Sequence, residues 1–348
     1  MKKDTIQRIT EYLEELVKTP SPSGFTHTVE AKLMDRLQDL GFEPRQGTKG
    51  TVFCTLNPET EGEGIILSAH IDTLGFMVRQ IKGNGRLRVT MIGGFPFQYV
   101  EQENVTIHTR SGETYEGCFR LNEPAAHGRR DLGSADRNDE TMEIVLDERV
   151  HNAEETQALG IRSGDFVSLD PRFRRAGDGY IKSRHLDDKA SSAILLALAK
   201  AIKHGEFKPA RPVTILFSNY EEVGHGAATA KVEGVTDFIA VDMGVVADDL
   251  KTNEEKVSIC AKDSTGPYNY DLTTALIHTA AELELDYAVD IYPFYGSDAA
   301  AALAAGNDYR HALIGPGVAA SHGYERTHEE GLWNTYALLK AYLEHKKA

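Results

Sequence analysis

The sequence has few cysteines, one tryptophan and no long hydrophobic run. Its 3 cysteines, Cys54, Cys118 and Cys260, are widely spaced, which excludes a disulfide framework and paired-cysteine zinc ligation. The longest apolar run covers residues 193–199, far short of the roughly 20 residues that cross a bilayer. The opening MKKDTIQRITEYLEE contains no apolar stretch of the kind that a secretory signal requires. We therefore expect a cytoplasmic protein without a membrane role.

Basic residues are also too few for a nucleic-acid partner. Lysine and arginine number 38 against 53 aspartates and glutamates, and the formal net charge is −15. Binding to a phosphate backbone needs a dense basic surface. The hydrophobic content of 41% is that of an ordinary folded protein. Because 348 residues exceed the roughly 100–200 of one domain, the length favours two domains or one α/β body with an insertion.

Strand-like and helix-like segments alternate in residues 1–72 and 178–348. Examples are the apolar run GIILSA, the helical pattern of residues 190–204 and the strand PVTILFSNY. This alternation predicts an α/β fold with a mixed, largely parallel central sheet and helices on both faces. Residues 73–177 contain short β-like runs separated by turn residues, which predicts a smaller inserted β domain. Within it, residues 122–140 lack periodicity and predict a long surface loop.

Acidic and imidazole side chains follow several of the apolar strands. The strand ends carry His70, Asp72, Glu221, Glu222 and Asp242. His322 follows another apolar segment, HALIGPGV. In open α/β sheets the carboxyl ends of the strands form the ligand-binding edge. We therefore expect these side chains to converge on one crevice although they are far apart in the sequence.

Each motif is weak when taken alone. The HxD pair of His70 and Asp72 is more often a surface turn than a metal site, and Asp187, at the start of a predicted helix, is as often a cap as a ligand. If the site is real, Asp72 would orient the His70 ring by accepting its distal N–H. Adjacent Glu221 and Glu222 at the end of a buried strand are costly unless a cation neutralises them. One of the two could bind a metal while the other serves as general base.

The number and type of these side chains suit a two-metal site. Two imidazoles and three carboxylates can bind two divalent ions about 3.5–4 Å apart that share one carboxylate. We interpret Asp187 as the shared carboxylate because of its place at a helix N-terminus, although the sequence alone does not separate it from Asp188. Zinc favours such nitrogen and oxygen ligands, and cobalt or manganese would also fit.

Five motifs together resemble one enzyme family. The segments AHIDTLGF, HLDDK, NYEEVG, VDMG and SHGYERTH occur in the order and spacing of the tetrahedral (TET) metallo-aminopeptidases, the glutamyl-aminopeptidase-like group. The resemblance covers essentially the whole chain. ALGIRSGDFVSLD resembles the end of the family's small β domain, and YGSDAAAALAAG resembles its substrate-side loop.

The resemblance implies a ligand set for the two metals. One ion would be bound by His70, Asp187 and Asp242, and the other by Asp187, Glu222 and His322. The choice of Asp187 over its neighbour as the shared ligand follows the family pattern. Two divalent ions per chain are thereby implied, with zinc as the first expectation.

The resemblance also implies roles for two further residues and for the inserted domain. Glu221 would be the general base, and Asp72 would orient a metal-binding histidine. The inserted domain, residues 73–177, would mediate dimerisation and substrate access, and the chain would self-associate into a hollow dodecamer. The substrate would be a short peptide that loses its N-terminal residue.

Three other functions stay open at this point. A deacylase or carboxypeptidase could use the same two-metal centre on a modified dipeptide, and blocking the amino terminus of the substrate would distinguish it. A non-catalytic metal-binding assembly protein would not need the unliganded Glu221. A glycosidase built on Glu221 and Glu222 is a poorer interpretation, because it leaves both histidines and both aspartates without a role and because glycosidase carboxylates usually lie about 5–9.5 Å apart.

Overall fold

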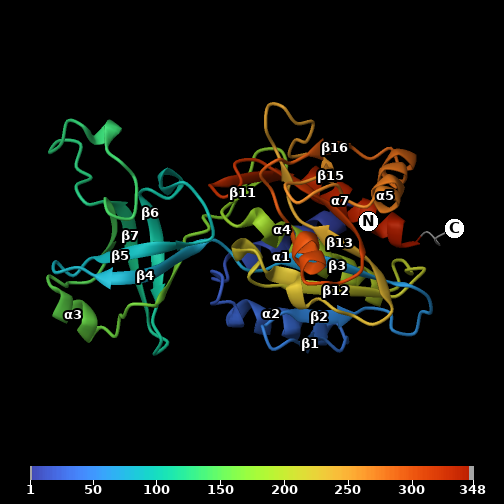
Figure 1. Ribbon diagram of the computed structural model, residues 1–348, viewed down its shortest axis with the longest axis horizontal. Coiled ribbons are helices and arrows are strands. Elements are labelled where there is room, and N and C mark those ends of the chain that lie inside the picture. The colour runs from blue at the N-terminus through green and yellow to red at the C-terminus, as the bar shows by residue number, and fades with distance from the viewer. Residues whose placement is uncertain (1, 345–348) are drawn as a thin grey trace. The chain divides into compact units, whose positions relative to one another are not determined.

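The computed structural model describes residues 2–344 and divides the chain into two compact units (Figure 1). One unit combines Met1–Asp72 with Arg172–Ala348, and the other consists of Thr73–Pro171. The first is built on a mixed sheet covered by helices, and the second on a closed barrel. The predicted fold class, an α/β body with a smaller β domain, is confirmed.

The central sheet of the first unit is largely parallel. Within residues 2–344 its strand order is β1 (Arg45–Gln46), β2 (Val52–Thr55), β12 (Val213–Ser218), β3 (Gly64–His70), β13 (Val235–Val241), β17 (Arg310–Val318), β15 (Val257–Lys262) and β16 (Tyr287–Ile291), with β14 (Gly244–Val245) paired to β17. The inner strands β12, β3, β13 and β17 run parallel to one another. Strands β2 and β15 pair antiparallel with β12 and β17. The parallel inner strands therefore end at the same edge.

A hydrophobic core lies on each face of this sheet, because successive side chains of a strand point to opposite sides. In β3, Ile65 and Leu67 pack into a core shared with side chains of five helices, whereas Ile66 packs into a second core. The first core involves α1 (Lys2–Val17), α2 (His27–Asp39), α4 (Leu186–Lys203), α5 (Tyr270–Glu282) and α7 (Glu329–Glu344). The second involves α6 (Asp298–Ala304) and the 3-10 turn η4 (Gly226–Thr229).

Helix α4 lies at the centre of the first unit and carries the HLDDK motif at its start (Figure 1). It contacts α1, α7 and β3, so nearly all of its residues are buried. The backbone of Asp187 and Asp188 is not helical, and the regular helix therefore begins near Ala190, as the sequence predicts. A smaller sheet of β10 (Arg174–Ala176), β11 (Tyr180–Ser183) and β18 (Glu325–His328) completes this unit.

Lys189 connects the start of α4 to the end of α1. Its side chain is fully buried, and its ammonium nitrogen donates to the carbonyl oxygens of Leu16 (3.0 Å) and Thr19 (2.9 Å) and to Oγ of Ser21 (2.7 Å). Burial lowers the pKa of Lys189 to about 7. In turn, Ser21 donates to the carbonyl oxygen of Ile71 (2.8 Å). The lysine thus fixes the segment that supports the end of β3.

We expect Lys189→Met to lower the free energy of unfolding by about 3 kcal/mol, since it leaves buried acceptors without a donor. The measurement is chemical denaturation of the metal-free protein. Lys208→Met removes an exposed lysine and is the control, for which a change within about 0.5 kcal/mol is expected. Equal stability of the two variants would show that Lys189 does not hold this segment.

The second unit is a closed barrel of antiparallel pairs. Its strands are, in order around the barrel, β4 (Gly75–Ile81), β5 (Leu87–Ile92), β8 (Met142–Leu146), β7 (Thr114–Leu121), β6 (Glu103–His108) and β9 (Phe166–Leu169). Phe76 and Phe119 meet in its core with ring centroids 4.7 Å apart. Between β7 and β8 the described chain has only one short 3-10 turn, η2 (Leu132–Ser134), so residues 122–140 form the long loop predicted. Helix α3 (Ala153–Ala158) and the turn η1 (Phe97–Tyr99) complete the unit.

Two further features concern the state of the cysteines and the length of the helices. Cys54, Cys118 and Cys260 are free thiols, and the first and last are buried. None of the helices in residues 2–344 combines the length and the apolar character needed to cross a bilayer.

Candidate metal centre

The predicted site residues lie at the carboxyl edge of the parallel strands. His70 is the last residue of β3, and Asp242 directly follows β13. Glu221 and Glu222 belong to the 3-10 turn η3 (Glu221–Val223) after β12. Asp187 stands at the start of α4, and His322 lies between β17 and β18. The structure therefore brings together side chains that are separated by up to 252 residues (322 − 70) in the sequence.

Three residues with left-handed backbone stand in or beside the segments that carry these side chains. His185, Tyr220 and His322 have left-handed backbone, with φ of 65°, 66° and 64°. This conformation costs a non-glycine residue about 1–2 kcal/mol. Tyr220 directly precedes Glu221, and His185 lies two residues before Asp187. Residues in such conformations cluster at functional sites, where the surrounding structure holds them.

Asp187 lies between the two imidazoles. Its Oδ1 is 3.0 Å from Nε2 of His70, and its Oδ2 is 3.4 Å from Nε2 of His322. The same nitrogen of His322 is 3.6 Å from Oε2 of Glu222. Each imidazole thus faces a different oxygen of one carboxylate. A carboxylate placed in this way could contact a cation beside each imidazole.

Two overlapping groups of side chains could each bind a cation. One consists of His70, Asp187 and Glu222, and the other of His70, Asp188 and Asp242; within each group the ligand atoms lie within 4.8 Å of one another. Asp187 lines the cavity of the site, whereas Asp188 is completely buried and its Oδ2 accepts the backbone N–H of His70 (3.3 Å). Asp187 therefore faces the cavity, whereas Asp188 belongs to the second group from a fully buried position.

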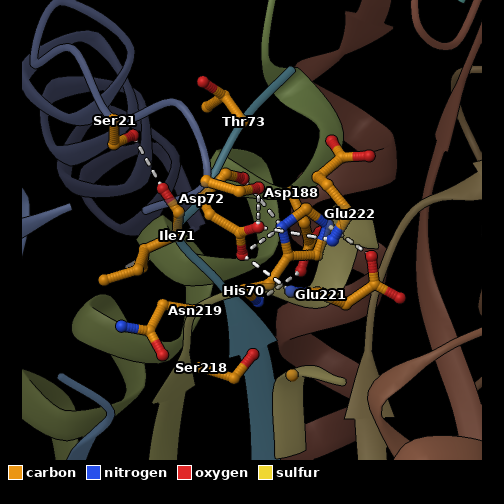
Figure 2. Close-up of polar contacts among 12 residues, drawn as sticks. Ser21, His70, Ile71, Asp72, Thr73, Asp188, Ser218, Asn219, Glu221 and Glu222 are labelled. Carbon is orange, nitrogen blue, oxygen red and sulfur yellow. Dashed lines mark hydrogen bonds and ion pairs between the residues drawn. The ribbon is translucent and has the colours of Figure 1, made fainter. Parts of the chain in front are cut away.

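Asp72 acts on the site in a different way from the one expected. The Nδ1–H of His70 donates to the backbone carbonyl oxygen of Asp72 (2.9 Å), while the Asp72 carboxylate is 3.7 Å from that nitrogen. The carboxylate instead accepts the backbone N–H groups of Glu221 (3.1 Å) and Glu222 (3.3 Å) and the hydroxyl of Ser23. Figure 2 shows the Asp72 side chain on one side of the His70 ring and the side chains of Glu221 and Glu222 on the other. The predicted ring orientation is thus provided by main chain, because the carboxylate is engaged by η3.

Glu325 is a residue of the site that the sequence analysis missed. Its two carboxylate oxygens accept the backbone N–H groups of Asp187 (3.1 Å) and His322 (3.0 Å). It therefore fixes the main chain of two candidate ligands at once. The available signal was the acid of SHGYERTH, three residues after the histidine.

The electrostatics of the centre favour the binding of a cation. Burial, and then the neighbouring Asp242, raise the pKa of Glu221 well above its usual value. Burial and Asp187 do the same for the pKa of Glu222, and burial raises the pKa of Asp242 to about 7. Burial opposes the charged form of His70, but the surrounding acids outweigh it and raise the pKa of the imidazole. Buried carboxylates in this number need a cation, and the nitrogen and oxygen donors fit zinc or a similar divalent ion.

A cavity of about 440 Å³ adjoins these side chains. Among the described residues that line it there is no lysine or arginine. Its charged side is formed by Asp187, Glu221, Glu222, Asp242 and His322. The uncharged part of the lining comes from Thr265, the segment 294–297, and Ala300, Ala301 and Ala304. The centre is therefore accessible to a small substrate group and is bordered by an uncharged wall.

Comparison with known proteins identifies the family. The family model described as M42 glutamyl aminopeptidase matches residues 50–338. The chain is 43% identical over 340 residues to the candidate aminopeptidase YhfE of Bacillus subtilis (strain 168), which covers 98% of both chains. It is 28% identical to the glutamyl aminopeptidase of Lactococcus lactis subsp. cremoris (strain MG1363), over 68% of this chain and 66% of the relative.

A solved structure agrees with this result at the level of the fold. The TET1 peptidase of Pyrococcus horikoshii superimposes with a TM-score of 0.84 at 21% identity, over 97% of this chain and 100% of the other. The family resemblance inferred from the five motifs is thus confirmed, and the chain belongs to the M42 glutamyl aminopeptidase family of peptide-bond hydrolases.

Proposed function

We propose that this aminopeptidase uses two divalent metal ions that share Asp187. The observation that carries the proposal is the position of the Asp187 carboxylate, with one oxygen 3.0 Å from Nε2 of His70 and the other 3.4 Å from Nε2 of His322. Asp242 would complete the site of the first ion and Glu222 that of the second. The donor set suits zinc, and cobalt or manganese would also be accepted.

Two such ions would supply Lewis acidity that activates water and polarises the scissile carbonyl group. We assign the proton transfers to Glu221. Its Oε2 is 3.8 Å from Nε2 of His70, and its side chain lines the cavity. A carboxyl with a raised pKa is suited to accept the proton of the attacking water and pass it to the leaving amine. The free α-amino group of the peptide would be attracted to the acidic side of the cavity.

Asp72 would act as a positioning residue for this base. Because its carboxylate accepts the N–H groups of Glu221 and Glu222, it fixes the turn that carries both side chains. The orientation of His70 does not depend on that carboxylate, since the ring bonds to a main-chain oxygen.

We therefore expect Asp72→Asn to lower kcat by about 10–100-fold, the range typical of residues that hydrogen-bond to the metal-binding groups. Most of the metal should be retained. The amide has one acceptor oxygen where the carboxylate has two, so the turn loses a hydrogen bond. The measurement combines steady-state kinetics with metal analysis. Asp308→Asn, at an exposed position, is the control and should retain wild-type kcat. Wild-type kcat in Asp72→Asn would remove Asp72 from the mechanism.

We also propose that the chain self-associates. The Pyrococcus horikoshii relative is described as able to assemble into a tetrahedron or a large octahedral shell. By analogy, residues 73–177 would mediate dimerisation and substrate access, and twelve chains would form a hollow particle. Light scattering of the purified protein tests this, and a monomer at micromolar concentration would contradict it.

The proposed activity is tested with matched substrates. A dipeptide and its N-acetylated form are compared with the metal-loaded protein. Removal of the N-terminal residue from the free form alone supports the aminopeptidase, whereas turnover of the acetylated form would favour the deacylase or carboxypeptidase alternative. Metal binding without turnover of either substrate would indicate the non-catalytic alternative.

A further inference from the structure

One part of the cavity wall carries no formal charge. Phe294 and Ser297 contribute from the segment before α6, and Ala300, Ala301 and Ala304 contribute from α6 itself. The side chain of Phe294 is fully exposed at this border. Among the described lining residues, the four acids and His322 belong to the proposed catalytic group, and Tyr295 is the other ionisable residue.

We infer that the enzyme prefers peptides whose N-terminal residue has an uncharged side chain, and that the wall formed by Phe294, Ser297 and the alanines of α6 sets this preference. The inference rests on the proposed function, because it places the side chain of the first residue in this cavity. It differs from the preference that the family description names, since glutamate would need a cation in the wall.

The wall is held in a fixed shape. Oγ of Ser297 lies 3.0 Å from the hydroxyl of Tyr268, which itself donates to Oδ2 of Asp263 (2.7 Å). At the start of α6, Asp298 accepts the hydroxyls of Ser68 (2.6 Å) and Ser218 (2.5 Å). The helix is thereby tied to the ends of β3 and β12, which carry the catalytic side chains. One cation next to the lining, Lys49, is engaged by the carbonyl oxygens of His225 and Gly226 and is therefore not free to pair with a substrate carboxylate.

An acidic side chain would be disfavoured most strongly. It would enter a space with no lysine or arginine among the described lining residues and would lie beside the acids that line it, Asp187, Glu221, Glu222 and Asp242. An unpaired charge moved out of water is strongly unfavourable. The same acids make a cationic side chain less unfavourable, but they offer it no free partner. Of these acids, Asp187, Glu222 and Asp242 would bind metal and Glu221 would serve as the base. Asp298, at the start of α6, already accepts two hydroxyls and the N–H of Ala227 (2.8 Å).

The test uses pairs of substrates that match in shape and differ in charge. The metal-loaded full chain is assayed with dipeptides that begin with glutamine or glutamate, and with norleucine or lysine. We expect kcat/KM to be at least about 100-fold higher for glutamine than for glutamate, and at least about 10-fold higher for norleucine than for lysine. The larger ratio for the acidic pair follows from the excess of carboxylates.

A pair of variants assigns the preference to the wall. Ala304→Arg puts a cation at the exposed end of α6 that borders the cavity. It should reduce the ratio of kcat/KM for the glutamine substrate to kcat/KM for the glutamate substrate by about tenfold or more. Ala305→Arg adds the same charge one residue later, at an exposed position outside the lining, and should leave the ratio unchanged.

The outcomes separate this inference from the proposed function. Equal or faster cleavage of the glutamate or lysine substrate would overturn the preference and leave the aminopeptidase intact. An equal effect of both arginine variants would overturn the role of the wall. Failure to cleave any of the four free-amine substrates would overturn the proposed function and the inference together.

Discussion

Replacing Glu221 with glutamine is expected to lower kcat by about 1,000-fold or more while the protein keeps its metals. Glutamine has nearly the same shape but cannot accept a proton, and general-base catalysis contributes about 10²–10⁴-fold. Glu221 is not among the proposed ligands, so its loss should not release a metal. Steady-state kinetics and metal analysis of the same preparation give both quantities.

The control for this variant is Glu233→Gln, the same chemical change at an exposed position. It should show wild-type kcat. If Glu221→Gln retained activity within about tenfold of the wild type, below the usual contribution of a general base, the proton transfer would belong to another group. If it lost metal together with activity, Glu221 would be a ligand, and the base would have to be sought elsewhere.

Removal of the metals should cause the second large loss of activity. Treatment with a chelator is expected to lower activity at least about 1,000-fold, since both Lewis acidity and the activated water depend on the ions. Addition of zinc, cobalt or manganese should restore it. The thermal midpoint should also fall, because Glu222 and Asp242 are buried among other acids without a compensating charge. Activity that survives chelation and dialysis would contradict the two-metal mechanism.

The loss of thermal stability on metal removal should become larger as the pH rises. In the metal-free protein, burial raises the pKa of Asp242 to about 7 and also raises the pKa of Glu222. In the unfolded chain these groups ionise near pH 4, so between about pH 4 and 7 the folded state binds more protons and its stability falls as pH rises. Metal ions require the ionised form. The difference in thermal midpoint between metal-loaded and metal-free protein should therefore widen from pH 5.5 to pH 8.

Calorimetry at the two pH values measures this difference, with the metal-loaded protein as the reference at each pH. A difference that stayed constant or narrowed with rising pH would show that the buried acids are not the metal ligands. The comparison is internal to one protein, so it does not depend on any substitution.

The α/β class and the edge of the sheet were predictable because strong signals coincide there. The apolar runs before His70 and Asp242 are long, buried on both faces and followed directly by polar ligands. Strand β16 gives only a weak signal, since its segment YAVDI mixes exposed and buried positions at the edge of the sheet. Helix α6 was missed as a helix because it is a short alanine-rich segment without amphipathic periodicity.

The details of the site depend on the backbone and could not be read from residue spacing. The HxD spacing is compatible with a bond from His70 to either the carboxylate or the carbonyl oxygen of Asp72, and the fold selects the carbonyl. Likewise, the pair Asp187 and Asp188 is ambiguous until the non-helical start of α4 directs one side chain into the cavity and buries the other. Glu325 acts only through main-chain N–H groups, an interaction that no sequence pattern specifies.

The metal content of the freshly purified protein tests the central claim most directly. The wild type should contain about two divalent ions per chain, as a two-metal site requires, and Asp187→Asn should lose both because the two ions share this carboxylate. Asp308→Asn should retain two. A wild type that binds no more than one ion, or an Asp187→Asn variant that keeps two, would contradict the shared-ligand centre.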